Sequence, residues 1–275
     1  MAYKFVINAG HGQKNNGLDP GAIGATGYKE YIETKEIADL VSIKLQYNGI
    51  ETLVIQDGDL EDITNKSNSW KADYFVSIHC NSFSADSHGV ETFSLISTGK
   101  GRILAESIHK ELVPATGLYD RGLKTANYYV LKYTDCPAVL TEIGFISNPT
   151  EEALMKDSTW DNKVSTAIAK GICNFLGITY IDQTSEQIQN NNGDDNVKFA
   201  VLGFSLKDLG ACMLVAEKYS NCAIYFRNSD KSFNQDCLKA ETLFVVGGTS
   251  VGHKNEKLLS GLSAKDTLQA VVNIL

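Results

Sequence analysis

Short apolar runs alternate with helical patterns along the first 180 residues, and this alternation limits the possible folds more than any other feature of the sequence. Runs rich in β-branched and aromatic residues, each bounded by turn residues, predict strands. They are Tyr3–Gly10, Thr52–Asp57, Asp73–Cys80, Gly89–Ile96 and Ala138–Phe145. Apolar residues three or four positions apart predict helices from Glu30, over Arg102–Leu112 and over Val164–Leu176. This order predicts an α/β fold, a mostly parallel twisted sheet with helices on both faces.

A polar stretch from Ile181 to Asn196 interrupts this pattern. It has almost no apolar residues and ends in Asn, Gly and Asp, so it cannot bury surface and is predicted to be a linker. We therefore expect one domain over residues 1–180, a linker over 181–196 and a second domain over 197–275. The second part has three short apolar runs and helical patterns at about 206–219 and 264–274, which predict a second, small α/β domain.

The composition argues against several classes of protein. The formal net charge of −8 disfavours a general nucleic-acid binder, although residues 197–275 carry 9 Lys and Arg against 7 Asp and Glu, a balance of +2. Apolar stretches are only strand-length, so no membrane insertion is expected. None of the six cysteines forms a C-x-x-C pair, and the N-terminus lacks an export signal. Both features predict reduced thiols in a protein held in the cytoplasm.

Three potentially functional side chains come at the ends of predicted strands. His11 directly follows the first strand, and His79 and Glu142 come at the ends of strands over Tyr74–Ile78 and Ala138–Thr141. In open α/β sheets, ligands bind at the carboxyl ends of the strands. We therefore expect these three side chains to converge on one edge of the sheet.

Glu30 opens the first long helix and completes a potential metal site with His11 and His79. Two imidazoles and one carboxylate are the ligand set of a catalytic zinc ion, and nitrogen donors favour zinc over magnesium. The loop between two of these ligands, Gln13–Thr26, is rich in Gly and Asn; we expect it to lack regular structure and to line the cleft. The alternative is that each of these residues has only a structural role. For Glu30, the helix dipole by itself favours a glutamate at the start of a helix.

No sequence motif links the other histidines to further potential ligands or catalytic residues. His88, His109 and His253 are interpreted as ordinary surface residues. Cys80 follows His79 directly, and successive strand side chains point to opposite faces. If His79 faces the site, Cys80 is therefore expected to face the core.

Six motifs in one order, from Tyr3 to about Gly177, carry a family resemblance. They are NAGHG followed by DPGAIG; GYKE with Thr34 behind it; DYFVSIHCNS; GVETFS; DRGLKTANYYVL; and CPAVLTEIGFISNPTEE. In these motifs the sequence resembles the zinc-dependent N-acetylmuramoyl-L-alanine amidases of the amidase-3 family. The resemblance implies one Zn2+ ion held by His11, Glu30 and His79, with Glu142 as the catalytic glutamate. Asn81, Glu91 and Arg121 lie in matching motifs without an assigned role.

The implied reaction is hydrolysis of the amide between N-acetylmuramic acid and L-alanine in peptidoglycan. One region departs from the family, which usually carries a Thr-Arg pair and a later Arg after the second strand. Here that region reads DGDLEDITNKSNSWKAD, with Lys66 as its nearest basic residue. The departure concerns the support or the substrate contacts of that helix, and it leaves the implied metal site intact.

The run ETLFVVGGTS with a helical pattern behind it resembles the wall-binding C-terminal regions of endolysins from clostridial phages. A hydrolase of an insoluble polymer gains from such a tether, because anchoring raises its effective concentration. With no export signal, we expect a phage or prophage endolysin, held in the cytoplasm until lysis and then acting on the cell wall. Two alternatives stay open: another zinc-dependent amide hydrolase, such as a peptidase or deacetylase, and a catalytically inactive wall-binding protein.

Overall fold

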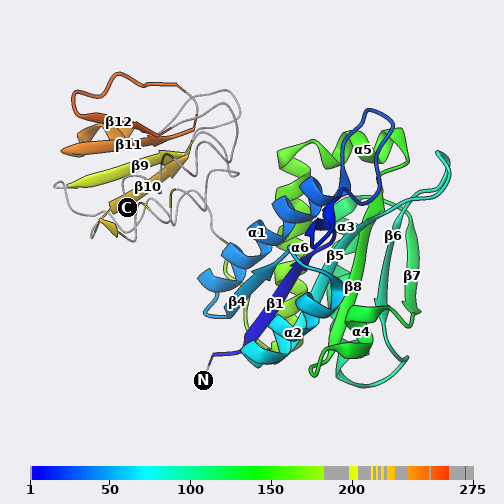
Figure 1. Cartoon of the computed structure of the whole chain (residues 1–275). Coiled ribbons are helices and arrows are strands. Elements are labelled where there is room, and N and C mark those ends of the chain that lie inside the picture. Colours follow the sequence, from blue (N-terminus) through cyan, green and yellow to red (C-terminus); the bar gives the residue numbers. More distant parts are fainter. Residues whose placement is uncertain are drawn as a thin grey trace. The chain divides into compact units, whose positions relative to one another are not determined.

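The computed structural model of the chain describes residues 2–182 without interruption. Beyond them it describes 198–203, 212, 215, 218, 219, 222–226, 235–247, 249–259 and 270. The chain divides into two compact units, Met1–Asp182 and Gln183–Leu275 (Figure 1). Among the described residues, no helix has the length and apolar character needed to cross a membrane.

A six-stranded sheet forms the centre of the first unit, in the order β4-β1-β5-β8-β6-β7. Its strands are β1 (Lys4–Ala9), β4 (Glu51–Ile55), β5 (Tyr74–Asn81), β6 (Val90–Ser94), β7 (Asp120–Thr125) and β8 (Ala138–Phe145). Strands β4, β1, β5 and β8 are parallel, whereas β6 pairs antiparallel with β8 and β7 continues parallel to β6. The predicted α/β fold with a mostly parallel sheet is confirmed. The edge strand β7 was not predicted, because its sequence DRGLKT has few apolar residues.

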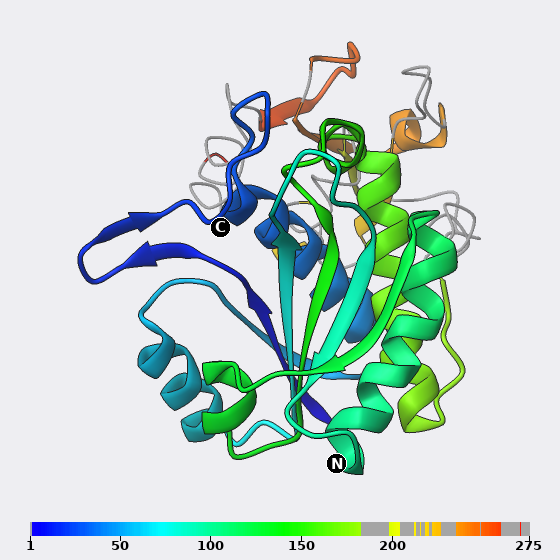
Figure 2. The same ribbon diagram turned by 90° about the vertical axis from the view of Figure 1, so that its right-hand side faces the viewer.

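Helices cover both faces of this sheet (Figure 2). Three long helices, α1 (Glu30–Tyr47), α3 (Gly99–Thr116) and α6 (Ser158–Leu176), pack on one face and enclose the larger core. Two shorter helices, α2 (Leu60–Trp70) and α4 (Tyr129–Tyr133), pack on the other face over a smaller core. A further short helix, α5 (Pro149–Met155), follows β8.

Alternation along the central strands decides which side chains meet each face. In β5, Tyr74, Val76 and Ile78 belong to the larger core, and Phe75 belongs to the smaller one. Cys80 continues the first series and is buried in the larger core, as predicted. Because side chains alternate with a period of two, His79 points to the face that carries α2 and α4.

His79 and Glu142 lie within their strands instead of beyond them. Strand β5 extends to Asn81 and β8 to Phe145, and His79 is the direct register partner of Glu142. The predicted ends at Ile78 and Thr141 were therefore too early. The strands continue because the two backbones go on pairing past the apolar residues, and the register shifts only between His79 and Asn81.

The Gly- and Asn-rich loop after His11 contains an antiparallel hairpin, which corrects the expectation that it would lack regular structure. Its strands are β2 (Gly12–Lys14) and β3 (Gly17–Asp19). Asn15 at its tip donates from Nδ2 to Asp59 Oδ2 at 2.8 Å, and the backbone N–H of Gln13 donates to Asp57 Oδ1 at 2.9 Å. These bonds to the chain before α2 hold the hairpin in place.

The chain between the hairpin and α1 is anchored on α5 by a buried carboxylate. Glu152 accepts hydrogen bonds from the backbone N–H of Thr26, at 3.1 Å to either oxygen, and from its hydroxyl at 2.6 Å. Burial alone would raise the pKa of Glu152, but these donors hold that pKa below its ordinary value of 4.5. The stabilisation is therefore fully present above pH 4.5 and is lost as the pH falls through the lowered pKa.

We expect Glu152→Gln to lower the free energy of unfolding by about 1–3 kcal/mol at pH 7, because the neutral amide accepts these bonds more weakly. The difference between wild type and variant should shrink as the pH falls towards 4. Urea unfolding at pH 7, 5 and 4 measures both effects. Glu106→Gln, which removes an exposed pair with Arg102, is the matched control and should cost less than about 1 kcal/mol. An equal loss for Glu152→Gln at all three pH values would contradict the assignment.

The second unit contains a four-stranded parallel sheet in the order β10-β9-β11-β12. Its elements are β9 (Phe199–Gly203), β10 (Cys222–Phe226), the short 3-10 helix η2 (Gln235–Lys239), β11 (Thr242–Val246) and β12 (Glu256–Leu259). Most of the helical patterns at 206–219 and 264–274, and all but the first two residues of the predicted linker 181–196, lie outside the described residues. The wall-binding role of residues 197–275 stays a prediction.

Candidate metal centre and active-site pocket

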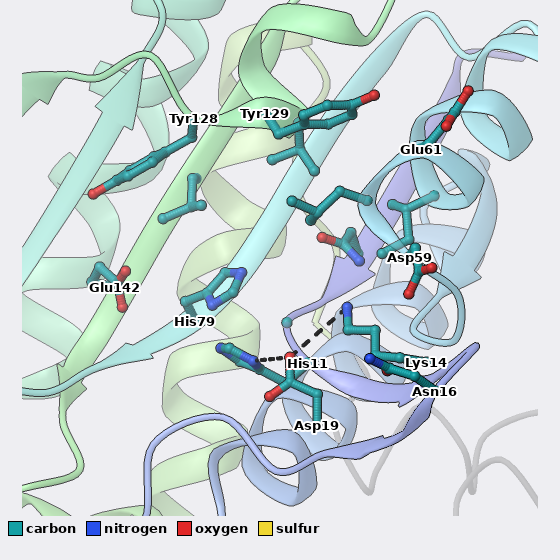
Figure 3. A pocket seen from close by; sticks show the side chains of 16 residues that line it. His11, Lys14, Asn16, Asp19, Asp59, Glu61, His79, Tyr128, Tyr129 and Glu142 are labelled. Atoms are coloured by element: carbon teal, nitrogen blue, oxygen red, sulfur yellow. Dashed lines mark hydrogen bonds and ion pairs between the residues drawn. The ribbon is translucent and has the colours of Figure 1, made fainter.

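Three sequence-predicted residues from different elements meet at the end of strands β1 and β5. His11 follows β1, Glu30 is the first residue of α1, and His79 lies in β5. One potential ligand atom from each residue lies within 4.8 Å of the other two. In Figure 3 the imidazoles of His11 and His79 lie next to each other, with Glu142 beside His79.

The carboxylate of Glu30 lies between the two imidazoles and is almost completely buried. Its Oε1 is 3.0 Å from His79 Nδ1, and its Oε2 is 3.2 Å from His11 Nε2. The backbone N–H groups of Cys80 and Ala22 donate to the same two oxygens at 2.9 and 2.8 Å. Burial raises the pKa of Glu30, but the hydrogen bonds with His11 and His79 outweigh it and hold that pKa well below 4.5. The carboxylate is therefore ionised and its orientation is fixed.

His11 is oriented by a second carboxylate that sequence reasoning did not assign. Asp19 Oδ2 lies 2.9 Å from His11 Nδ1, which leaves Nε2 facing Glu30. Burial lowers the pKa of His11, but Glu30 and Asp19 together raise it above 6.5. A carboxylate on the second ring nitrogen is the usual support of a metal-binding histidine. Asp19 opens the motif DPGAIG, and this position was the one signal available in the sequence.

Two glycines make the close approach of these side chains possible. A Cβ at Gly10 would lie 2.4 Å from Cε1 of the His79 ring. A Cβ at Gly21 would lie 2.6 Å from both Glu30 Oε2 and His11 Cδ2. Gly21 also has φ of +65°, which other residues rarely adopt. The glycines of the motifs NAGHG and DPGAIG therefore provide space for the cluster.

The donor set fits a zinc ion. With bonds of about 2.0–2.2 Å, donor atoms of a tetrahedral zinc site lie roughly 3.4 Å apart. One ligand atom from each of the three residues lies within 4.8 Å of the other two, so small shifts of the side chains bring them to that spacing. Two nitrogens and one carboxylate oxygen leave a fourth position of the ion for solvent or substrate, as in catalytic sites.

Asp19→Asn tests the support of His11. We expect the substitution to lower the affinity for zinc about 10- to 100-fold, because the amide no longer stabilises the required tautomer and orientation of the ring. Competition against a chromophoric chelator measures this affinity. Asp86→Asn, in the exposed turn before His88, is the matched control and should leave it unchanged. Unaltered zinc affinity of Asp19→Asn would show that the contact is incidental.

Glu142 lies beside the cluster with one carboxyl oxygen unused. Its Oε2 is buried and has no hydrogen-bond partner among the described residues. Burial first, and then the negative charges of Glu30 and Glu91, raise the pKa of Glu142 well above 4.5. A carboxyl group with a raised pKa and an unpartnered oxygen is suited to accept a proton and then to donate it.

The residues that had no assigned role form one cluster next to Glu142. Glu91 is the register partner of Glu142 in β6 and accepts from Asn81 Nδ2 at 2.6 Å, from Arg121 Nε at 2.7 Å and from Lys124 Nζ. Burial raises the pKa of Glu91, but Lys124 and Arg121 outweigh it and hold that pKa below 4.5. These contacts keep Glu91 ionised. They also give Arg121 a structural role, as the alternative to a catalytic one.

A pocket of about 900 Å³ opens over the cluster (Figure 3). His11, His79 and Glu142 line it, together with Lys14, Asn16 and Asp19 from the hairpin, Asp59, Leu60, Glu61 and Ile63 around the start of α2, and Tyr128, Tyr129 and Val130 around the start of α4. As expected, the Gly- and Asn-rich segment lines the cleft. The tyrosines and Lys14 were not singled out from the sequence, because only the packing of α4 and the hairpin brings them to the pocket.

The interpretation of His109 as a surface residue is wrong. It is buried on α3, with Thr92 Oγ1 3.0 Å from its Nδ1 and Asp120 Oδ1 2.8 Å from its Nε2. Helix α3 packs against both α6 and the sheet. It is therefore buried on a wider face than the spacing of its apolar residues predicts. His88 is exposed as expected, whereas His253 is half-buried with its Nε2 2.9 Å from the Ala240 carbonyl oxygen.

Comparison with known proteins relates this arrangement to one family. The Amidase_3 family, described as N-acetylmuramoyl-L-alanine amidase, matches residues 5–174. A sporulation-specific N-acetylmuramoyl-L-alanine amidase of Bacillus subtilis is 36% identical over 176 residues, which cover 62% of this chain and 66% of that protein. An endolysin of Bacillus phage SPP1 is 34% identical over 190 residues, which cover 65% of this chain and 68% of that protein.

A solved structure shows the same fold. The catalytic domain of the N-acetylmuramoyl-L-alanine amidase CwlV from Bacillus (Paenibacillus) polymyxa var. colistinus superposes with a TM-score of 0.58 at 36% identity, and the match covers 64% of this chain and 99% of that domain. The match to the Bacillus subtilis amidase leaves about a third of that protein unmatched. The family match over residues 5–174 covers His11, Glu30, His79 and Glu142. The chain belongs to the Amidase_3 family of N-acetylmuramoyl-L-alanine amidases.

Proposed function

We propose that this protein is a zinc-dependent peptidoglycan hydrolase that cleaves the amide between N-acetylmuramic acid and L-alanine. One observation carries the proposal: the donor atoms of His11, Glu30 and His79 lie within 4.8 Å of one another, and His11 and His79 line a pocket that Glu142 also lines. The family to which the chain belongs supports the choice of substrate.

His11, Glu30 and His79 are proposed to hold the metal. Bound there, zinc would polarise the substrate carbonyl as a Lewis acid and would lower the pKa of a bound water to about 7. The chain contributes the rest of the site. Glu30 is held by two backbone N–H groups and His11 by Asp19, so the ligands keep their positions without rearrangement.

Glu142 is proposed to move the proton. Its unpartnered Oε2 takes a proton from the attacking water and later delivers it to the nitrogen of L-alanine as the amide bond breaks. This delivery is necessary because an amide anion is a very poor leaving group. Burial and the neighbouring charges of Glu30 and Glu91 favour the protonated form, so Glu142 can hold the proton between the two steps.

Product analysis of digested cell walls tests the proposal. Purified peptidoglycan is incubated with the zinc-loaded full chain, and the products are identified by mass spectrometry, with chelated enzyme as the control. The proposed reaction releases peptides with a free L-alanine amino terminus and leaves glycans with intact lactyl groups. Release of acetate would identify a deacetylase, other new amino termini would identify a peptidase, and an absence of zinc-dependent products would indicate an inactive wall-binding protein.

A further inference from the structure

Lys14 is the one positively charged lysine or arginine side chain among the residues that line the pocket. The other acidic lining residues outside the metal cluster are Asp19, Asp59, Glu61 and Glu142. The pocket wall is therefore acidic with a cation at one place. An anionic group of a ligand is repelled by these carboxylates and attracted by Lys14, the cation that the described chain itself contributes to the wall.

The Lys14 side chain is largely covered, and its ammonium group makes no hydrogen bond to the described residues. The side chain is 15% exposed, and its nearest ionic partner is Asp19 Oδ2 at 4.0 Å, too far for a hydrogen bond. Nζ has no hydrogen-bond acceptor in the part of the chain that the structure describes. An ammonium has three N–H donors, and a ligand in the pocket can accept from them. A ligand oxygen in the pocket would satisfy these donors.

Lys14 is held close to the site of reaction. It is the last residue of β2, and the neighbouring Asn15 fixes the hairpin to Asp59. Asp19 Oδ2 lies 4.0 Å from Lys14 Nζ and 2.9 Å from His11 Nδ1, so the two nitrogens are no farther apart than the sum of these distances. In Figure 3, Lys14 lies on the opposite side of the two imidazoles from Glu142.

The substrate class of the proposed function, on which this inference rests, places an anion at a matching distance. The second residue of the peptide in peptidoglycan is a D-glutamyl residue linked through its γ-carboxyl group, so its α-carboxyl group is free or amidated. Two extended residues span about 7 Å, which is the reach from the scissile nitrogen to this group. That reach is about equal to the upper bound on the distance between Lys14 Nζ and His11 Nδ1.

We propose that Lys14 binds the free α-carboxylate of this D-glutamyl residue and makes the enzyme prefer peptides in which the carboxylate is not amidated. The contact is a charge-assisted hydrogen bond from Nζ. Lys14 is a specificity residue in this assignment, because it contacts the substrate away from the bond that breaks. The alternative is that Lys14 only supports the negative charge of Asp19 beside His11.

A matched pair of soluble substrates separates these roles. N-acetylmuramoyl peptides that carry either D-isoglutamate or D-isoglutamine at the second position differ by one carboxylate. For the zinc-loaded full chain, kcat/KM should be about 10- to 100-fold higher for the carboxylate form. Lys14→Gln should remove this preference, chiefly by raising KM for the carboxylate form, and Lys14→Arg should retain most of it. Lys35→Gln, which removes an exposed pair with Asp39 on α1, is the control and should keep the preference.

Equal losses on both substrates in Lys14→Gln, or a fall in its zinc content, would show that Lys14 supports Asp19 and would overturn the assignment. A binding measurement separates this result from failure of the proposed function. In the Glu142→Gln background, calorimetry should show about 10- to 100-fold tighter binding of the carboxylate peptide, and adding Lys14→Gln should abolish the difference. If wild type cleaves neither peptide, the proposed reaction is wrong. If the Glu142→Gln protein binds the two peptides equally, the proposed role of Lys14 is wrong.

Discussion

Glu142→Gln is expected to lower kcat by about 10²- to 10⁴-fold while the protein keeps its zinc. Glutamine has nearly the same shape as glutamate but cannot take a proton from water or return one to the leaving amine. Glu142 is outside the His11–Glu30–His79 cluster, so its loss does not remove a metal ligand. Initial rates on purified cell walls and zinc content by elemental analysis measure the two quantities on the same sample.

The structural setting of Glu142 explains why this substitution should leave the fold intact. Its Oε2 has no hydrogen-bond partner in the described part of the chain, so glutamine breaks no contact there. The melting temperature should therefore stay near that of wild type. Glu111→Gln on α3, where the half-buried residue accepts from Asn174 Nδ2, is the control for the loss of one charge. Activity near wild type in Glu142→Gln would exclude this residue as the proton carrier.

His11→Ala is expected to abolish both zinc binding and hydrolysis. The substitution removes one of three ligands and leaves Asp19 and Glu30 without the imidazole that separates them. Zinc content should fall from one ion per chain towards zero, and activity should fall to that of chelated wild type. Elemental analysis after dialysis and turbidity loss of cell-wall suspensions check these outcomes.

The fold of His11→Ala should persist, because the His11 side chain is 27% exposed and lies outside the apolar cores. His88→Ala is the matched control: this imidazole is exposed in a turn, and the variant should keep zinc and activity. A His11→Ala protein with one tightly bound zinc ion and low activity would mean that the ion is held by other residues.

Much of the first unit could be predicted from local patterns. Alternation of apolar runs and helical spacing is a property of neighbouring residues, and it predicted the mostly parallel α/β sheet that the structure contains. The period of two along β5 placed Cys80 in the core and His79 on the opposite face. The motifs around His11, Glu30, His79 and Glu142 were recognised because each is continuous in the sequence.

Other features could not be read locally. Strand β7 is polar in sequence and forms because β6 offers it an edge to pair with. His109 has the spacing of a surface residue but is buried because α3 packs against α6 and the sheet at once. Asp19 and Lys14 gained their roles from the hairpin, whose position depends on bonds to residues more than forty positions away.

By itself, the sequence determined the long helices and the central strands of the first unit and the alternation of side chains along those strands, because these features depend on periodicity over a few residues. Only the tertiary structure decided that His11, Glu30 and His79 offer donor atoms within 4.8 Å of one another and that Glu142 and Lys14 lie on opposite sides of them. Those distances arise from the packing of strands, a helix and a hairpin that are far apart in the chain. No local pattern encodes how closely such elements approach.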